Sequence, residues 1–142
     1  MKIRPALLAD SSSIASLLAE LGYSSEIEEV AARLQRLGEI DSAGVLVVDD
    51  GGTVIALLAF HVIELLERPR PTCRITALVT AASRRRKGAA SLLLEAVSTL
   101  AEGRGCERLE VTTKPERAEA LALYLGHEFS ERPRRLVKYL DG

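Results

Sequence analysis

The stretch Ile75–Leu94, ITALVTAASRRRKGAASLLL, joins three kinds of local sequence in one short run. It begins with β-forming residues, continues through the four consecutive cations of Arg84–Lys87, and reaches Gly88. Apolar residues then recur at i, i+3, i+4, i+7, i+8 and i+11 from Ala89 to Leu100, which is the spacing of an amphipathic helix. The run therefore predicts a strand, a basic loop (Arg84–Gly88) and a helix that begins after the glycine.

The start of this helix has the chemistry of an anion site. The first turn of a helix presents unpaired backbone N–H groups and a partial positive charge. Glycine and the alanines Ala89 and Ala90 let an anion approach the backbone closely. The run is not a P-loop, because its lysine precedes the glycine, and it is not a dinucleotide fingerprint, because it holds one glycine. A solvated basic loop, or a nonspecific nucleic-acid contact, is the alternative interpretation of the charges alone.

The rest of the chain alternates between helical and strand patterns. Helix stripes end at Gly22 and Gly38, and the turn Asp49–Gly52 separates two β-branched runs as in a hairpin. The order predicts an α/β (α+β) fold with a mixed central sheet and helices on both faces, in a single domain over residues 1–142. The expected elements are strands at Lys2–Pro5, Gly44–Val48, Thr53–Leu66, Cys73–Thr80, Glu107–Thr113 and Arg134–Leu140, a helix capped by Asp10 or Ser11, a second with a Ser25–Glu28 capping box, and a last one after Pro115 that carries Ala118–Leu125.

Composition excludes several classes of protein. Nineteen basic residues face 20 acidic ones, which argues against a bulk polyanion partner. The cysteines Cys73 and Cys106 make no disulfide framework and, with two histidines, no zinc-ligand spacing, so we expect reduced thiols and no metal. The N-terminus lacks a signal-peptide pattern and no apolar run is long enough to span a bilayer. We therefore expect a cytoplasmic protein.

The segment Arg85–Ala90 matches the pattern Gln/Arg-x-x-Gly-x-Gly/Ala, placed between an apolar strand and an amphipathic helix. In this the sequence resembles the GCN5-related N-acetyltransferase (GNAT) family. The opening Ile3–Asp10 looks like the family's first strand and helix. Arg117–Ala120 with Leu123-Tyr124, followed by Phe129, looks like its last helix and the strand after it. The resemblance covers essentially the whole chain, and the late segment is most similar to members that acetylate small amines.

The resemblance implies a fold, a reaction and a set of site residues. It implies an acyl-CoA N-acyltransferase fold that uses acetyl-CoA as cosubstrate and transfers acetyl to the primary amine of a small molecule by direct attack in a ternary complex. Tyr124 falls on the family's tyrosine, and a tyrosine with a pKa of about 10 can protonate the leaving thiolate. A homodimer is possible, and neither nucleic acid nor membrane is expected as a partner. The residues implied in acetyl-CoA binding are Leu78, Val79 and Thr80 beside the pantetheine arm and Arg85, Arg86, Lys87, Gly88, Ala89, Ala90 and Ser91 around the pyrophosphate.

The sequence also departs from the family pattern. Ala77 stands where a glutamate often serves as base, and His61 or Glu64 is a possible substitute. Further departures are Ala56 for a glycine, Lys114 for an asparagine beside the pantetheine arm, and Glu128 for a glycine. These favour an alternative hypothesis, a catalytically degenerate module that binds CoA without turnover. A basic-loop nucleic-acid binder is a third hypothesis, against which the near-zero net charge argues.

Overall fold

The computed structural model describes residues 1–113, 117–132 and 135–140. It divides the chain into two compact units, Met1–Thr112 and Thr113–Gly142, which we describe separately. That one domain spans residues 1–142 stays a prediction. The first unit contains the sheet and the basic loop, and the second contains Tyr124.

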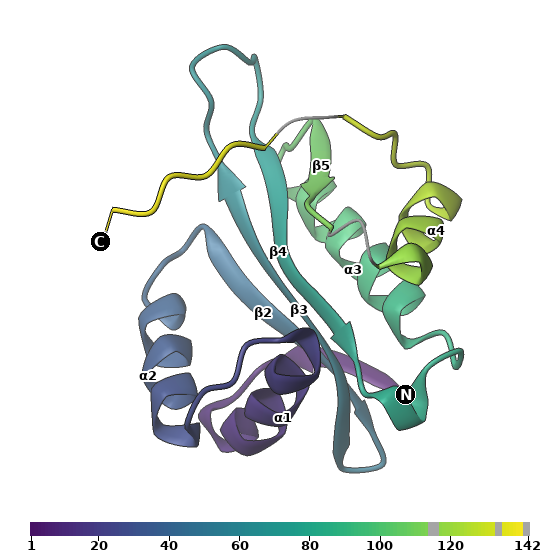
Figure 1. The fold of residues 1–142 in the computed structure, drawn as a ribbon. Helices are drawn as coiled ribbons and strands as arrows, with labels where there is room; N and C mark the ends of the chain where they lie inside the picture. Colours follow the sequence, from purple (N-terminus) through teal and green to yellow (C-terminus); the bar gives the residue numbers. More distant parts are fainter. Residues whose placement is uncertain (114–116, 133–134, 141–142) are drawn as a thin grey trace. The chain divides into compact units, whose positions relative to one another are not determined.

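The first unit is built on one five-stranded sheet in which spatial order follows chain order (Figure 1). The first four strands pair antiparallel, and the last pair is parallel. The predicted mixed sheet is therefore confirmed. The strands are β1 (Lys2–Pro5), β2 (Ala43–Asp50), β3 (Thr53–Ile63), β4 (Thr72–Thr80) and β5 (Arg108–Val111).

Helices cover both faces of this sheet, as predicted. The helices α1 (Ser11–Leu21) and α2 (Ile27–Gly38) pack on one face, and α3 (Ala89–Gly103) packs on the other (Figure 1). On the face of α1 and α2, alternate strand residues join the helices in one core cluster. The buried members of this cluster are Ile14, Ala15, Leu17, Val30, Val47, Val54, Leu57 and Val79.

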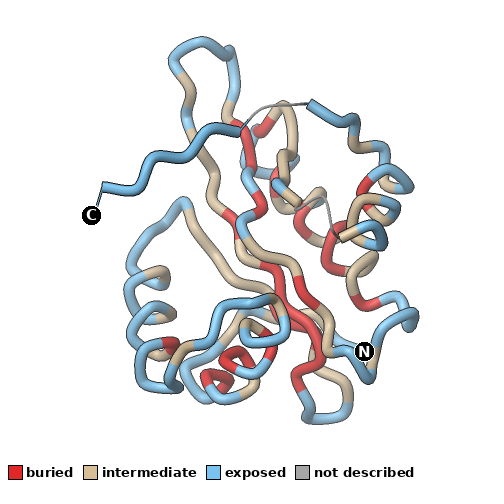
Figure 2. Tube along the Cα trace, in the orientation of Figure 1, coloured by how far each residue is buried: buried red, intermediate tan, exposed pale blue. Residues whose placement is uncertain are grey.

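The opposite face is equally apolar. Leu58, which alternates with Leu57 along β3, is fully buried, as are Leu93 and Val97 of α3. Figure 2 shows this burial concentrated in the middle of β3 and β4 and along the inner side of α3. Each such side chain contributes about 1.5–3 kcal/mol on burial, so this two-sided core stabilises the packing of α3 and of the other helices on the sheet.

A charged cluster attaches β1 to its neighbours. The Arg4 guanidinium donates to Asp10 (Nη1–Oδ2, 2.8 Å) and to Asp49 (Nε–Oδ2, 3.1 Å). Asp10 also accepts the Leu7 N–H at 2.7 Å. The hydrogen bonds from Arg4 keep the pKa of the Asp10 carboxyl below its ordinary value. The residue expected to cap the first helix therefore precedes that helix as predicted, but its carboxylate holds β1 and the turn at Leu7.

The predicted start of the second helix and the predicted end of the long hairpin strand are both wrong. The capping pair of α2 is Glu26 and Glu29, whose Oε1 accepts the Glu26 N–H at 2.9 Å, rather than Ser25 and Glu28. Ser25 instead accepts a hydrogen bond from Arg33 at 2.7 Å. The long hairpin strand ends at Ile63 and not at Leu66, because its ladder with β4 closes at the pair Ile63–Thr72.

The predicted strands in the last third of the chain are shorter or missing. β5 spans Arg108–Val111 rather than Glu107–Thr113, since its ladder with β4 holds four pairs. Residues 135–140 form no strand, and Leu136 and Leu140 are 94% and 89% exposed. A strand needs a neighbour that accepts its hydrogen bonds, and among the described residues this segment has none. Arg134, where the predicted strand begins, lies outside the described residues.

Candidate functional site

The strands β4 and β5 stop pairing halfway along β4. Their parallel ladder runs from Thr72–Arg108 to Ile75–Val111 and stops there. On its other side β4 continues to pair with β3 as far as Thr80–Ala56. Residues Ala77–Thr80 therefore have a strand neighbour on one side only. Their outward backbone groups form an open edge next to the β5 side, where an extended ligand can take the place of a strand.

A β-bulge marks the point where the strands part. Ala59 of β3 pairs with Ala77, and the next residue, Phe60, pairs with Ile75, so Thr76 is an extra residue in β4. A bulge bends its strand and increases the local twist. The bend lies between the last pair shared with β5 and the open edge, and it separates the two strands. Leu78, Val79 and Thr80, which the resemblance implies beside the pantetheine arm, all lie on this open edge.

The open edge leads directly into the basic loop and α3. Arg86 and Gly88 both have left-handed backbones, with φ of 67° and 84°. The first hydrogen bond of α3 runs from Leu92 N–H to Gly88 C=O at 3.0 Å, so the amides of Gly88, Ala89 and Ala90 precede the helical ladder. Left-handed turns at a helix start gather backbone N–H groups into a concave anion site.

The side chains of this loop fit the same interpretation. Arg85, Arg86, Lys87 and Gly88 are exposed, and Ala89 is buried beneath them. A Cβ at Gly88 would meet no atom within 4 Å, so the glycine leaves open space above the helix start. The residues implied around the pyrophosphate, from Arg85 to Ser91, thus form one continuous stretch of loop and first helical turn.

Three contacts fix the entrance to the loop. The Ala81 N–H donates to Ile55 C=O at 2.8 Å, and the Ala82 N–H donates to the Glu20 carboxylate at 2.8 Å. Arg84 Nη1 donates to Asp50 Oδ2 at 2.9 Å. The first cation of the run is therefore held at the tip of the β2–β3 hairpin, and the other three cations remain beside the helix start.

These anchoring roles could not be read from the sequence. From the sequence, Asp50 is expected only as part of the turn Asp49–Gly52. Glu20 and Asp50 each carry a contact between residues more than 30 positions apart, and no local signal predicts such a pairing.

In the second unit, the end of helix α4 (Ala118–Gly126) positions Tyr124. The Tyr124 C=O accepts the Phe129 N–H at 3.1 Å, and the two rings meet edge to face at 5.5 Å between centroids. The Leu125 C=O accepts the Glu128 N–H at 3.2 Å. This is a Schellman motif with its usual apolar contact, and it needs a left-handed residue at Glu128, whose φ is 69°. A left-handed residue at this position explains why glycine is common there in the family, and this chain has Glu128 instead.

Tyr124 itself is buried, and burial raises the pKa of its phenol above the ordinary value, while Arg117 acts in the opposite direction. A phenol with a raised pKa stays protonated throughout the neutral range and keeps a proton to donate. This is the protonation state that the predicted role requires. Lys114, expected beside the pantetheine arm, lies outside the described residues.

No carboxylate stands in the place of the expected base. Ala77 packs against the core cluster under α1 and α2. His61 lies in β3 on the row that pairs with Arg74, and it is half-buried. Glu64 lies beyond the end of β3 and is exposed. Of the two suggested substitutes, His61 is the one that the sheet places on the face of Ala77.

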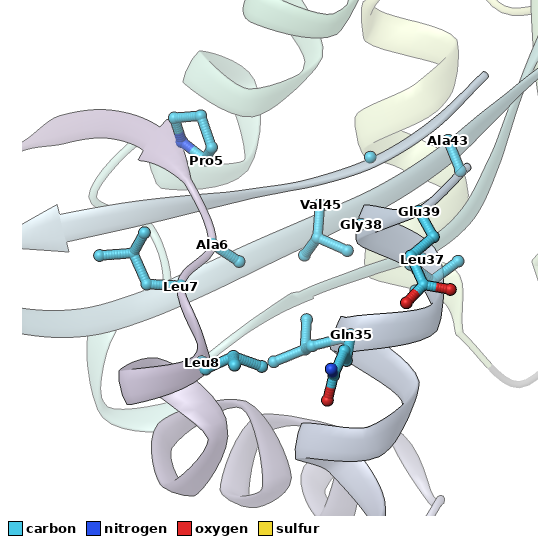
Figure 3. Close-up of a pocket in the computed structure, with 12 residues that line it drawn as sticks. Pro5, Ala6, Leu7, Leu8, Gln35, Leu37, Gly38, Glu39, Ala43 and Val45 are labelled. Carbon is cyan, nitrogen blue, oxygen red and sulfur yellow. The ribbon is translucent and has the colours of Figure 1, made fainter. Parts of the chain in front are cut away.

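A pocket of about 440 Å³ lies elsewhere in the first unit, between β1, α2 and the start of β2 (Figure 3). Its lining is mostly apolar, and its polar side chains are Gln35 and Glu39. None of the residues implied in acetyl-CoA binding lines it. We assign it no part in the proposed chemistry.

No group of three or more potential metal ligands occurs in residues 1–113, 117–132 and 135–140. Over the same part of the chain, no helix has the length and apolar character needed to cross a membrane.

Comparison with known proteins identifies the class of protein. Residues 12–129 match the model of the acetyltransferase (GNAT) family. This match covers most of the chain, so the chain belongs to the acetyltransferase (GNAT) family, whose members use acetyl-CoA as cosubstrate. No functionally curated protein matches the sequence closely enough to count as a relative.

Solved structures confirm the fold. A protein described as a transcriptional regulator from Bacillus halodurans C-125 superposes with a TM-score of 0.90 at 20% identity, covering 98% of this chain and 99% of the other. Glucosamine-6-phosphate N-acetyltransferase from Arabidopsis thaliana gives a TM-score of 0.85 at 19% identity, with 99% and 98% covered. An aminoglycoside acetyltransferase from an uncultured soil metagenomic sample gives 0.79 at 18%, with 98% and 94% covered. At these identities the likeness concerns the fold alone.

Proposed function

We propose that this protein is an acetyl-CoA-dependent N-acetyltransferase that acetylates the primary amine of a small molecule by direct attack in a ternary complex. The observation that carries the proposal is the parting of β4 from β5 at Ile75, with β4 continuing as an open edge to Thr80. An open strand edge that leads into a basic helix start suits a ligand with an extended amide-bearing arm and a diphosphate.

In this proposal the chain's own groups have distinct tasks. Backbone groups of Leu78, Val79 and Thr80 hold the pantetheine arm, and an N–H among them polarises the thioester carbonyl. The loop and first helical turn, Arg85–Ser91, hold the pyrophosphate. Tyr124 donates a proton to the departing thiolate. Acetyl-CoA supplies the activated acetyl group, and the amine must be neutral when it attacks.

A second candidate function is CoA binding without turnover. It is favoured by Ala77, whose methyl group packs into the core cluster where a base is expected. His61, or a water that relays the proton, would have to act in its place. The two candidates share the cofactor site and differ in whether thiol is released.

The experiment has two parts. Saturating CoA or acetyl-CoA, at a hundredfold excess over its dissociation constant, should stabilise the fold by about 2.7 kcal/mol. Absence of a thermal shift at millimolar CoA would contradict the cofactor site. Thiol release from acetyl-CoA with a panel of primary amines then distinguishes an enzyme from a binding module.

The same assay tests Tyr124. Tyr124→Phe should lower kcat by roughly 10²–10⁴-fold, the usual contribution of a general acid, with the affinity for CoA unchanged. Because burial raises the pKa of this phenol, Tyr124 stays protonated through the neutral range and beyond it, so its titration should cause no loss of the parent's activity at neutral or mildly alkaline pH. Equal turnover in the variant and the parent would remove Tyr124 from the mechanism.

A further inference from the structure

One row of cross-strand partners, on the sheet face that α1 and α2 cover, includes the charged side chains of Arg74 and Glu110. Direct cross-strand partners share a face of the sheet. The row consists of Ala43, His61, Arg74 and Glu110, which pair successively across β2, β3, β4 and β5. The next row inward is Val45, Ala59 and Ala77, and the one after it is the buried Val47, Leu57 and Val79. The same face thus passes from core to charge over three rows, with Ala77 between.

Two arginines share one carboxylate at this point. Arg74 donates a hydrogen bond to Glu110 Oε1 and forms an ion pair with this carboxylate. Arg108 Nη2 donates to Glu110 Oε2 at 3.0 Å. These three side chains, which we call the arginine pair and its glutamate, carry two positive charges and one negative charge.

Both guanidinium groups are held in place and remain reachable. Arg108 Nε also donates to the hydroxyl of Thr72 at 3.0 Å, and Thr72 is fully buried. The side chains of Arg74 and Arg108 are 48% and 38% exposed. Within the described part of the chain, Nη1 of neither arginine has a hydrogen-bond partner. Fixed guanidinium groups with donors to spare bind phosphate and carboxylate well, because little ordering is needed on binding.

The position of this pair relates it to the reaction. Arg74 lies three residues before Ala77 in β4, and the bulged Thr76 lies between them. Three extended residues span about 10 Å, which is the approximate distance along the strand from Arg74 to Ala77. An amine that attacks next to the open edge of β4 would therefore have the arginine pair within the length of a small molecule. A structural explanation also exists, since the three charges join β4 and β5 in their last rows before the strands part. That explanation does not account for the second arginine, since Glu110 balances the charge of only one of the two guanidinium groups.

We infer that the arginine pair binds an anionic group of the acceptor, so that the acceptor is a primary amine that also carries a phosphate or a carboxylate. This inference rests on the proposed function, because it treats the face of Ala77 as the acceptor side. The inference restricts the acceptor from any small amine to an amine that also carries an anionic group. A short spacer separates the amine from the anionic group.

The test uses two matched pairs of amines. 2-Aminoethyl phosphate is compared with ethanolamine, and β-alanine with β-alaninamide, by NMR titration of the protein with and without saturating CoA. We expect the anionic member of at least one pair to bind tenfold more tightly or better, and the pair that shows this distinguishes phosphate from carboxylate. Arg74→Gln and Arg108→Gln should each reduce the preference to threefold or less, whereas Arg36→Gln on α2 should leave it unchanged.

Glu110→Gln separates recognition from a structural role. Removing the shared negative charge should tighten the binding of the anionic amine by several fold, whereas loss of a purely structural contact would not. If Arg108→Gln unfolds β5, the Arg74→Gln variant alone is used for the test, because the Arg74 side chain is the more exposed of the two. Equal affinities within both matched pairs, or a preference that survives Arg74→Gln, would overturn the inference. Thiol release from acetyl-CoA, measured in parallel, distinguishes anion recognition by the arginine pair from acetyl transfer. If the anionic amine binds more tightly but no thiol is released, only the proposed function is contradicted.

Discussion

Replacing Gly88 with alanine tests the geometry of the proposed phosphate site. Gly88 precedes α3 with a φ of 84°, and a Cβ there would meet no atom within 4 Å. The substitution therefore introduces no clash, and its cost is conformational. A left-handed backbone costs an L-residue about 1–2 kcal/mol. The loop can avoid this cost by leaving the left-handed conformation, but it then loses the arrangement of N–H groups that we propose holds the pyrophosphate.

The magnitude of the effect on binding follows from that cost. If the free loop relaxes and must return to its original shape to bind, the dissociation constant for CoA rises by about 5–30-fold, which corresponds to 1–2 kcal/mol. Isothermal titration with CoA measures the constant, and thermal unfolding measures the effect on the fold.

Gly103 supplies the matched control on the same helix. It is the last residue of α3, its backbone is not left-handed, and a Cβ there would also meet no atom within 4 Å. Gly103→Ala should leave CoA binding unchanged and keep or slightly raise the melting temperature. If Gly88→Ala binds CoA within twofold of the parent and melts at the same temperature, the reasoning about the left-handed loop is refuted.

Three further predictions concern single contacts. Arg86→Gly should bind CoA about fivefold more tightly than Arg86→Ala in the same titration. Both variants lose the positive charge, but only alanine is strained in the left-handed backbone conformation of this position. Equal affinities of the two variants would contradict this prediction. Asp50→Asn should weaken CoA binding by about two- to fivefold, as expected for a partly exposed ion pair, and the charge swap Asp50→Arg with Arg84→Asp should recover most of the loss; failure to recover would exclude the pair as an anchor of the loop. Glu128→Gly should raise the free energy of unfolding by about 1 kcal/mol in urea titrations, since its left-handed backbone favours glycine; a destabilised variant would contradict the cap assignment.

The elements that local sequence specifies were predictable. The helical period after Gly88 and the β-branched run before the basic loop define α3 and β4 within one or two residues, because hydrophobic periodicity and a glycine are local signals. The position of the proposed anion site follows from these two elements alone.

Features that depend on a distant partner were not predictable. The bulge at Thr76 exists because β3 and β4 pair in one particular register, and nothing in the residues around Thr76 distinguishes it. The ion pairs of Arg74 with Glu110 and of Arg84 with Asp50 likewise join segments far apart in the chain. The strand expected at the C-terminus failed for the same reason, since residues 135–140 have suitable side chains and no pairing strand among the described residues.

The central claim is that the open edge of β4 and the start of α3 form one site for acetyl-CoA. Titration of ¹⁵N-labelled protein with CoA tests it residue by residue. We predict that the largest amide shifts occur at Leu78–Thr80 and at Arg86–Ser91, and that the amides lining the pocket between β1 and α2 stay in place. Shifts confined to other segments, or no shifts at millimolar CoA, would contradict the account.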